Sequence, residues 1–394
     1  MSRLPLEGIT VISLEQAVAA PFATRQLADL GARVIKVERD TGDFARGYDR
    51  KVHGMSSYFV WLNRGKESLV LDLKSDDGMR TLKALVSRAD VLVQNLAPGA
   101  VERLGLGPDD ALALNPRLVH VSISGYGRGG SHEQKKAYDL LIQCEAGLLS
   151  VTGRPDAPAK VGVSIADISA GMYAYTGVLT SLLQRGATGR GDVVEISMLE
   201  ALGEWMSQPY FYAEYGGAPP VSSGAQHASI APYGPFPTAD GTVFFGIQNE
   251  REWATFCSGV LAKPELSTDP RFSTNTLRVE NRAALHEVIE EALGGQTTDD
   301  AVARLDAANI ASAQLRDMHG FAAHPQLTER NRWHDVASPV GPVRSLIPPV
   351  TSRESGFRMG PVPELGEHTA AILAELAERP VTAAGAGGQR TPGS

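Results

Sequence analysis

The stretch ITVISLEQAVAAPFATRQLADLGARVIKVER, residues 9–39, decides the fold. ITVISLE (9–15) and ARVIKVER (32–39) are nearly continuous apolar runs, which are typical of strands buried on both faces of a sheet. Between them, PFATRQLADLG (21–31) has helical spacing and ends at a glycine. A strand, a helix and a second strand in this order predict a βαβ unit with parallel strands.

The same alternation continues along the chain. It predicts further strands at 68–73, 90–96 and 118–127 and a helix at 77–89. We therefore expect an α/β fold with an open, Rossmann-like parallel sheet. The first strand-to-helix turn, SLEQAVAAP, lacks the G-x-G-x-x-G glycines that cradle a dinucleotide pyrophosphate, so a nicotinamide or flavin enzyme is not expected.

The second half of the chain changes in character. A helix is predicted from 168 to 186 and a short strand at 193–197, whereas 216–236 is rich in Gly, Pro, Ser and Ala and predicts a long loop. The remaining segments predict mostly amphipathic helices with a few strands. We predict the following division: a large domain over 1–205 that resumes at 329–380, a linker at 206–225, a smaller α+β domain at 226–328 and a disordered tail at 381–394.

Composition excludes several classes of protein. The 394 residues are 43% apolar and 21% charged, with a net charge of −8 and no basic cluster interleaved with aromatics, which argues against a nucleic-acid partner. No apolar run approaches the ~20 residues of a membrane span, so we expect a cytoplasmic protein without a membrane partner. Cys144 and Cys257 match no metal or redox spacing and are expected to be small core residues, and no His/Cys cluster predicts a metal site.

One carboxylate, Asp167, lies in the otherwise apolar stretch VSIADISAGMYAY (163–175). As the residue before a predicted helix, it could be an N-cap that accepts backbone N–H bonds. Alternatively, the helix start keeps the carboxylate ionised although Ile165 and Ile168 desolvate it, which makes it a competent nucleophile. Gly171 indicates either tight packing or close approach of a ligand. The residues alone leave these alternatives open.

Two groups of polar residues could bind an anionic ligand. Lys136 and Tyr138 precede an apolar helix and could meet a phosphate and an acyl group, unless Asp139 caps that helix and the lysine is only solvated. The second group is basic or amide-bearing and lies near predicted strand ends, where it is either ordinary surface charge or a phosphate site: Arg39, Arg64, Lys66, Lys74, Asn95 and Arg103. His227, in the Gly/Ser-rich loop, is either a turn residue or a site residue.

Motifs along the chain resemble the family III CoA-transferases, which include formyl-CoA and carnitine CoA-transferases and alpha-methylacyl-CoA racemases. The resemblance reaches about residue 378 and rests on stretches in the same order, among them LGARVIKVER, NLAPGAVERLGL, YDLLIQCEAGLLSVTG, VSIADISAGMYAY, ATGRGDVVEISMLEA and LGEHTAAILAEL. It implies a two-domain chain that forms an interlocked homodimer. It also implies that coenzyme A (CoA) binds to the Rossmann-like domain as substrate and product, with no other cofactor.

The resemblance further implies the site residues. Asp167 matches the nucleophile of the family, and Gln16, Tyr138 and the loop with His227 are expected to support it. The positions that contact CoA carry over to these residues: Gln16, Ala17, Arg39, Leu71, Asp72, Leu73, Lys74, Asn95, Leu96, Ala97, Arg103, Lys136, Ala137 and Tyr138.

Two departures from the family pattern narrow the reaction. Racemases carry Gly-His-Asp where this chain has Ala137-Tyr138-Asp139, and a phenol, which ionises near pH ~10, is a poor acid/base group at neutral pH. A transferase is therefore favoured over a racemase-like isomerase or a non-catalytic CoA-binding protein. The loop SSGAQHASIAPYG (222–234) lacks the consecutive glycines of the formyl-CoA branch. The resemblance favours enzymes that move CoA from succinyl-CoA to dicarboxylic acids such as glutarate, itaconate, mesaconate or malate.

Overall fold

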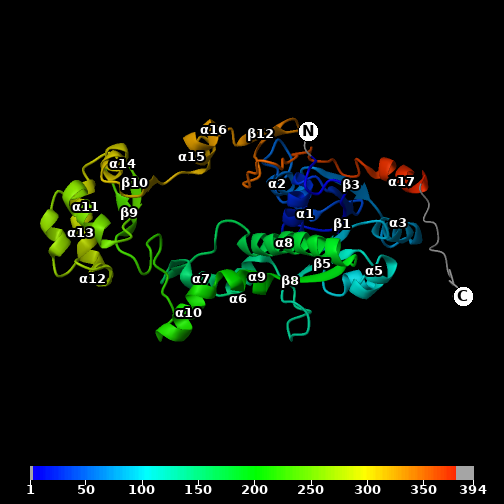
Figure 1. The fold of residues 1–394 in the computed structure, drawn as a ribbon, viewed down its shortest axis with the longest axis horizontal. Helices are drawn as coiled ribbons and strands as arrows, with labels where there is room; N and C mark the ends of the chain where they lie inside the picture. The colour runs from blue at the N-terminus through cyan, green and yellow to red at the C-terminus, as the bar shows by residue number, and fades with distance from the viewer. Residues whose placement is uncertain (1–2, 379–394) are drawn as a thin grey trace, which may run out of the picture. The chain divides into compact units, whose positions relative to one another are not determined.

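The computed structural model of the chain describes residues 3–378, which form two compact units (Figure 1). Unit 1 contains the residues up to Ala146, Gly162–Trp205 and the residues from Arg332 on, and unit 2 contains Gly147–Val161 and Met206–Asn331. Residues 147–161, which the sequence placed in the large domain, thus belong to the second unit. The predicted tail, 381–394, lies outside the described residues.

A six-stranded sheet forms the centre of unit 1, in the order β3-β2-β1-β4-β5-β8, and every neighbouring pair is parallel. The prediction of an open parallel sheet is confirmed. Strand β3 begins two residues before the predicted strand. The bounds are β1 Thr10–Leu14, β2 Arg33–Glu38, β3 Lys66–Val70, β4 Val91–Gln94, β5 Val119–Ser124 and β8 Asp192–Ser197.

Helices connect and cover these strands. Their bounds in unit 1 are α1 Ala19–Asp29, α2 Ser57–Asn63, α3 Asp76–Val86, α4 Ala100–Arg103, α5 Pro108–Leu114, α6 Asp139–Glu145, α8 Ile165–Thr188, α9 Met198–Trp205 and α17 Thr369–Glu378. Helices α1 and α8 lie side by side (Figure 1), and Gln26 Nε2 of α1 lies 3.5 Å from Met172 Sδ of α8. The C-terminal segment adds Ile372 to the core formed by the strands and α3. It also adds the antiparallel pair β12 (Trp333–Val336) and β13 (Val343–Leu346).

Unit 2 contains a small antiparallel sheet, β11-β10-β9, and a helical layer. Its core is aromatic and includes Phe236, Phe245, Trp253 and Phe256. The helix α10 occupies part of the segment predicted as a linker. The bounds are α7 Leu148–Val151, β6 Gly153–Arg154, β7 Ala157–Pro158, α10 Ser207–Gly216, β9 Tyr233–Pro237, β10 Thr242–Gly246, α11 Glu250–Thr255, α12 Asn275–Glu280, α13 Arg282–Leu293, α14 Thr298–Ala307, β11 Ser312–Gln314, α15 Met318–Ala322 and α16 Pro325–Glu329.

The predictions for the cysteines, for membrane spans and for metal sites can be compared with the structure of residues 3–378. Cys257 is buried in the core of unit 2, as expected, but Cys144 is exposed, so its placement in a core was wrong. Its helix, α6, turns that residue away from the apolar contacts of Ile142. Within the described chain, no helix is long and apolar enough to cross a membrane, and no group of three or more His, Cys, Asp or Glu side chains could hold a metal ion.

Candidate active site

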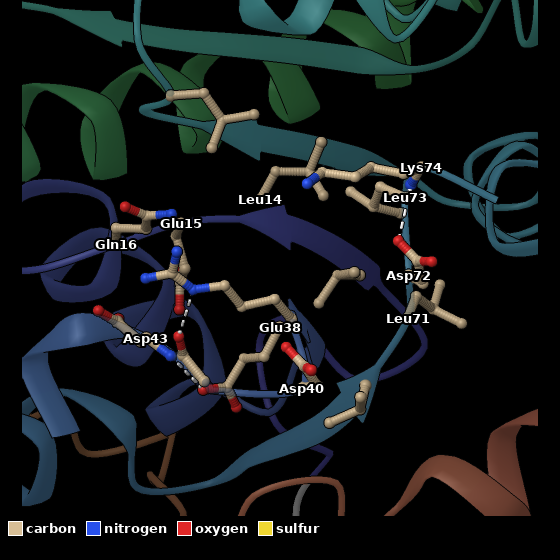
Figure 2. Close-up of a pocket in the computed structure, with 15 residues that line it drawn as sticks. Leu14, Glu15, Gln16, Glu38, Asp40, Asp43, Leu71, Asp72, Leu73 and Lys74 are labelled. Carbon is tan, nitrogen blue, oxygen red and sulfur yellow. Dashed lines mark hydrogen bonds between the residues drawn. The ribbon is translucent and has the colours of Figure 1, made fainter.

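A cavity of about 580 Å³ opens at the carboxyl ends of β1, β2 and β3 in unit 1. Ligands of open α/β sheets bind at this edge, close to the point where the strand order reverses, which here lies between β1 and β4. Figure 2 shows Gln16 and Asp43 on one side of the cavity and Asp72, Leu73 and Lys74 on the other. The lining residues are Leu14, Glu15, Gln16, Val37, Glu38, Arg39, Asp40, Gly42, Asp43, Val70, Leu71, Asp72, Leu73, Lys74 and Leu96.

Half of the predicted CoA contacts meet at this cavity. Those that line it are Gln16, Arg39, Leu71, Asp72, Leu73, Lys74 and Leu96. Asn95 lies behind the wall and hydrogen-bonds the backbone of Gln16, which precedes Ala17. Ala97 lines a second cavity, of about 290 Å³, which shares Leu96 with the first.

The other predicted contacts lie outside both linings. Arg103 ends α4, and its guanidinium approaches Gly99. Lys136, Ala137 and Tyr138 form the segment before α6, which packs closely on the end of β5: a Cβ added to Gly125 would lie 2.2 Å from that of Ala137. The Tyr138 side chain is 67% exposed and therefore accessible to a ligand.

The basic residues divide into two groups. Arg64 binds Asp29 at 2.8 Å and Lys66 binds Glu15 at 2.6 Å, and both cations are buried, so these two are part of the fold. A second group forms no ion pair with any carboxylate in residues 3–378: Arg39, Lys74, Arg103 and Lys136. Unpaired cations are the groups that can bind phosphates without first giving up a partner.

The start of helix α8 differs from its prediction. The helix begins at Ile165, with Ser164 at the N-cap position, so Asp167 is not the N-cap but a residue of the first turn. The backbone N–H groups of Ala166 and Asp167 instead donate to Asp139 Oδ1, at 2.8 and 3.3 Å. Asp139, predicted as a possible cap of its own helix, therefore caps α8, because α6 and α8 meet in space.

The Asp167 carboxylate is half-buried and, within residues 3–378, accepts no hydrogen bond. Burial, followed by the nearby Asp139 carboxylate, raises the pKa of Asp167 to about 7. Desolvation and the second carboxylate thus work against the ionised form that the helix start was expected to favour. A carboxylate with this pKa is more basic than an ordinary aspartate, and about half of it is ionised near pH 7.

Close packing between helices explains the glycine at position 171. A Cβ at this position would lie 2.6 Å from the backbone oxygen of Ala19 and 3.1 Å from Phe22 Cδ1. The glycine therefore allows α8 to approach α1 closely, which answers the alternative that the sequence left open. The second turn of α8, which contains Gly171, thus packs against α1, the helix that follows Gln16.

Comparison with known proteins covers both units and the site. The model of CoA-transferase family III matches residues 6–369, a range that includes the cavity, Asp139 and Asp167. The chain belongs to CoA-transferase family III. This family III chain is thus an enzyme of the CoA-transferase class, as the resemblance predicted.

Three relatives illustrate the likeness. Human succinyl-CoA:glutarate CoA-transferase is 33% identical over 381 residues, which are 94% of this chain and 86% of that protein. The acetyl-CoA:oxalate CoA-transferase of Acetobacter aceti is 33% identical over 379 residues, 95% of this chain and 96% of that one. The crystal structure of a CAIB/BAIF family protein from Brucella suis has a TM-score of 0.85 and 32% identity, and covers 95% of this chain and 100% of that one. The α/β fold with its parallel sheet therefore matches a solved structure.

One aromatic residue near the site of this CoA-transferase was missed in the sequence. The Tyr48 phenol interacts electrostatically with Asp43, Asp167 and Tyr138, and burial, followed by the carboxylates, raises the pKa of Tyr48 to about 12. Its ring centroid lies 5.7 Å from that of Phe44 and 5.4 Å from that of Tyr58. The available signal was the stretch GDFARGYDR directly after the second strand, but nothing in it indicated the proximity of Asp167.

His227, the remaining supporting candidate, belongs to unit 2. Its ring stacks on Tyr233 with a centroid distance of 5.2 Å, and its Nδ1 accepts the N–H of Ser229 at 3.2 Å. Its backbone oxygen accepts a bond from Arg282 at 2.9 Å. Within its own unit the residue thus has the contacts of an ordered turn.

Proposed function

We propose that this CoA-transferase moves CoA from succinyl-CoA to a dicarboxylic acid through covalent intermediates on Asp167. The observation that carries the proposal is the Asp167 carboxylate itself, which is half-buried, next to Asp139 and without a hydrogen-bond donor in the described chain. A carboxylate whose oxygens are not engaged by donors keeps its lone pairs for an electrophilic carbonyl carbon.

The proposed reaction exchanges acyl groups between oxygen and sulfur. An Asp167 oxygen attacks the thioester carbonyl, the carbon–sulfur bond breaks, and CoA leaves as a thiolate, so that Asp167 and the acyl group form a mixed anhydride. The thiolate then attacks the aspartyl carbonyl and releases the donor acid as a carboxylate, which leaves an aspartyl-CoA thioester. The acceptor carboxylate reverses both steps and regenerates Asp167. Thioester and anhydride are exchanged without net oxidation and without ATP.

The unpaired cations support the proposed binding of CoA. Arg39 and Lys74 line the 580 Å³ cavity from two different strand ends, and Arg103 and Lys136 extend the group beyond it. We therefore propose that these four residues bind the phosphates of CoA, with Gln16, Leu71, Leu73 and Leu96 around its less polar parts. Backbone and hydroxyl groups near Asp167, including Tyr138, would stabilise the tetrahedral oxyanions.

We propose the acceptor from two relatives that are named for glutarate and oxalate, both of which are dicarboxylic acids. Glutarate, itaconate, mesaconate and malate share with them a carboxylate to be activated and a second one that remains free. A panel of these acids, with oxalate, formate and carnitine, should show activity with diacids and none with formate or carnitine. We also propose a homodimer, which light scattering of the purified chain measures directly.

Intact-mass spectrometry tests the nucleophile. Succinyl-CoA without an acceptor should add the mass of CoA, less water, to the chain, and peptide mapping should locate it on Asp167. Asp167→Asn should give no adduct and lower the transfer rate at least ~1000-fold. Asp110→Asn, which removes an exposed carboxylate from α5, should behave as the wild type. Full transfer by Asp167→Asn would refute the mechanism.

Deuterated water separates the transferase from a racemase-like isomerase. A transferase that acts only on carbonyl carbon should produce acyl-CoA without deuterium at the alpha carbon. Incorporation at a rate similar to turnover would indicate proton abstraction by the Asp139 and Asp167 pair, and would favour the isomerase.

A lysine pair tests the binding site. Lys74→Ala removes an unpaired cation of the cavity and should weaken CoA binding about 5–10-fold. The matched control is Lys83→Ala, because Lys83 is exposed on α3 and lines neither cavity. Equal affinities of the two variants, measured by calorimetry, would remove Lys74 from the site.

A further inference from the structure

The turn between β1 and α1 has an unusual backbone. Ala17 has a φ angle of 60°, in the left-handed region that favours glycine. For an alanine this conformation costs about 1–2 kcal/mol. Gln16, the residue before it, lines the cavity (Figure 2). The chain therefore keeps a strained conformation directly at the wall of the proposed CoA site, and other groups must hold it there.

Two side chains hold this turn. Asn95 engages both backbone groups of Gln16: its Oδ1 accepts the N–H and its Nδ2 donates to the carbonyl, each at 2.9 Å. Asp43 Oδ1 accepts the N–H of Ala17 at 3.2 Å and that of Ala45 at 2.9 Å. Two residues from two different segments, Asn95 and Asp43, thus fix the backbone of Gln16 and Ala17.

Behind Asp43 lies a buried network of two cations and two carboxylates. Lys36 Nζ donates to Asp43 Oδ2 at 2.8 Å and lies 3.3 Å from Glu15 Oε1. Lys66 Nζ donates to Glu15 Oε1 at 2.6 Å, and Thr24 Oγ1 donates to Glu15 Oε2 at 2.5 Å. The side chains of all four charged residues are 0% exposed. The network therefore connects the residue before the turn, Glu15, with the residue that holds Ala17.

Stability alone does not account for this network. Four buried charges lose hydration, and an apolar cluster of similar volume stabilises a fold as well or better. The charges instead fix the orientation of the two carboxylates, because each carboxylate oxygen has a defined donor. The second oxygen of Asp43 is fixed by Lys36, so its first oxygen can point only at the N–H groups of Ala17 and Ala45.

We propose that Asp43, oriented by Lys36, is a positioning residue that holds the Gln16–Ala17 turn in its left-handed conformation and thereby shapes the wall of the CoA cavity. The inference rests on the proposed function, since it takes CoA as the ligand of that cavity. Asp43 also lines the cavity, but the proposed role does not require it to contact CoA. Its effect passes through the backbone of Ala17 to the side chain of Gln16.

The first test measures CoA affinity by calorimetry at a temperature where every variant is folded. Asp43→Asn keeps an oxygen for Ala17 and Ala45 but replaces the acceptor of Lys36 with a donor, so the orientation is lost. We expect CoA to bind about tenfold more weakly. Asp29→Asn is the matched control: it weakens the buried pairs of Asp29 with Arg25 and Arg64 without touching the turn, and should lower thermal stability with unchanged CoA affinity.

The second test uses the strain itself. Glycine adopts a φ of 60° without penalty, so Ala17→Gly should reduce the need for support. The tenfold effect of Asp43→Asn should shrink to about twofold or less in the Ala17→Gly background. If Asp43→Asn does not fold, Asn95→Ala, which removes the other support and no buried charge, should weaken CoA binding and be relieved by Ala17→Gly in the same way.

The outcomes separate the two proposals. Wild-type protein that does not bind CoA would overturn the proposed function. Wild-type protein that binds CoA, with Asp43→Asn equally tight, or with an equal loss in both backgrounds, would overturn the positioning role alone. A weaker binding of the Asp29→Asn control would also overturn it, because the loss would then follow from general destabilisation.

Discussion

The starts of α1 and α8 are two regions of unit 1 that each contain carboxylates removed from solvent. They differ in whether a cation compensates the negative charge. Before α1, Glu15 is fully buried; although burial opposes ionisation, Lys66 and Lys36 lower its pKa below the usual range. At α8, Asp167 has neither a paired cation nor a hydrogen-bond donor among residues 3–378, and burial and Asp139 raise its pKa to about 7. Burial alone therefore does not distinguish the proposed nucleophile from a structural carboxylate, whereas burial without a compensating cation does.

The two regions also differ in how they use their neighbours. Both carboxylate oxygens of Glu15 accept a hydrogen bond. Asp139 accepts the backbone N–H of Ala166 in α8 with one oxygen and Gln143 Nε2, at 2.7 Å, with the other. Of these three carboxylates, Asp167 is the one that accepts no hydrogen bond within the described residues. Satisfied carboxylates hold backbone in place, and the unsatisfied one is available for covalent chemistry.

The largest expected effect comes from breaking the charge pairing before α1, so that buried charges there lose their partner as Asp167 lacks one at α8. Glu15→Gln removes the carboxylate that pairs with both buried lysines, Lys36 and Lys66, and should lower the free energy of unfolding by about 3–5 kcal/mol, measured by urea denaturation. The double variant Glu15→Gln/Lys66→Met, which restores the balance of charge, should lose less than the single variant. A loss below ~1 kcal/mol in Glu15→Gln would contradict the assignment of the network as tightly coupled.

The converse change, removing the uncompensated charge, should stabilise the protein. The pKa of Asp167 is about 7 in the folded chain and 3.8 as a reference, so the wild type loses stability as the pH rises between these values. Asp167→Asn lacks this loss. Its advantage in free energy of unfolding should grow by about 1–2 kcal/mol between pH 5 and pH 8, after allowance for partial exposure. A pH-independent difference from wild type would count against the raised pKa, with Asp110→Asn as the control.

Sequence predicted the sheet because its signal is local. Each strand of the ITVISLE type is a largely apolar run, and each following helix has its own period, so the strands and their parallel pairing follow from short stretches. The edge at which ligands bind follows from the same rule, and Arg39, Lys74 and Asn95 are at that edge in the structure.

The pairing of charges could not be predicted in the same way. Arg64 and Lys66 looked like Arg39 and Lys74 in the sequence, but their partners, Asp29 and Glu15, are distant in the chain and meet them only in the folded structure. The cap of α8 was missed for the same reason, since Asp139 is on another helix. Helix position was inferred from the residue before the apolar run, and the true start lies three residues earlier.

The smallest expected effect concerns the neighbour that raises the pKa of Asp167. Asp139→Asn keeps an oxygen for the N–H groups of Ala166 and Asp167 but removes a negative charge. Because a negative neighbour opposes ionisation, its removal should lower the pKa of Asp167, and the acid limb of kcat/KM should move to lower pH. The rate at pH 8 should fall less than about tenfold, since Asp167 is ionised there in both proteins and only its basicity changes. An acid limb that stays in place would mean that burial alone sets this pKa, and that the contrast between the two helix starts is one of solvation and not of charge.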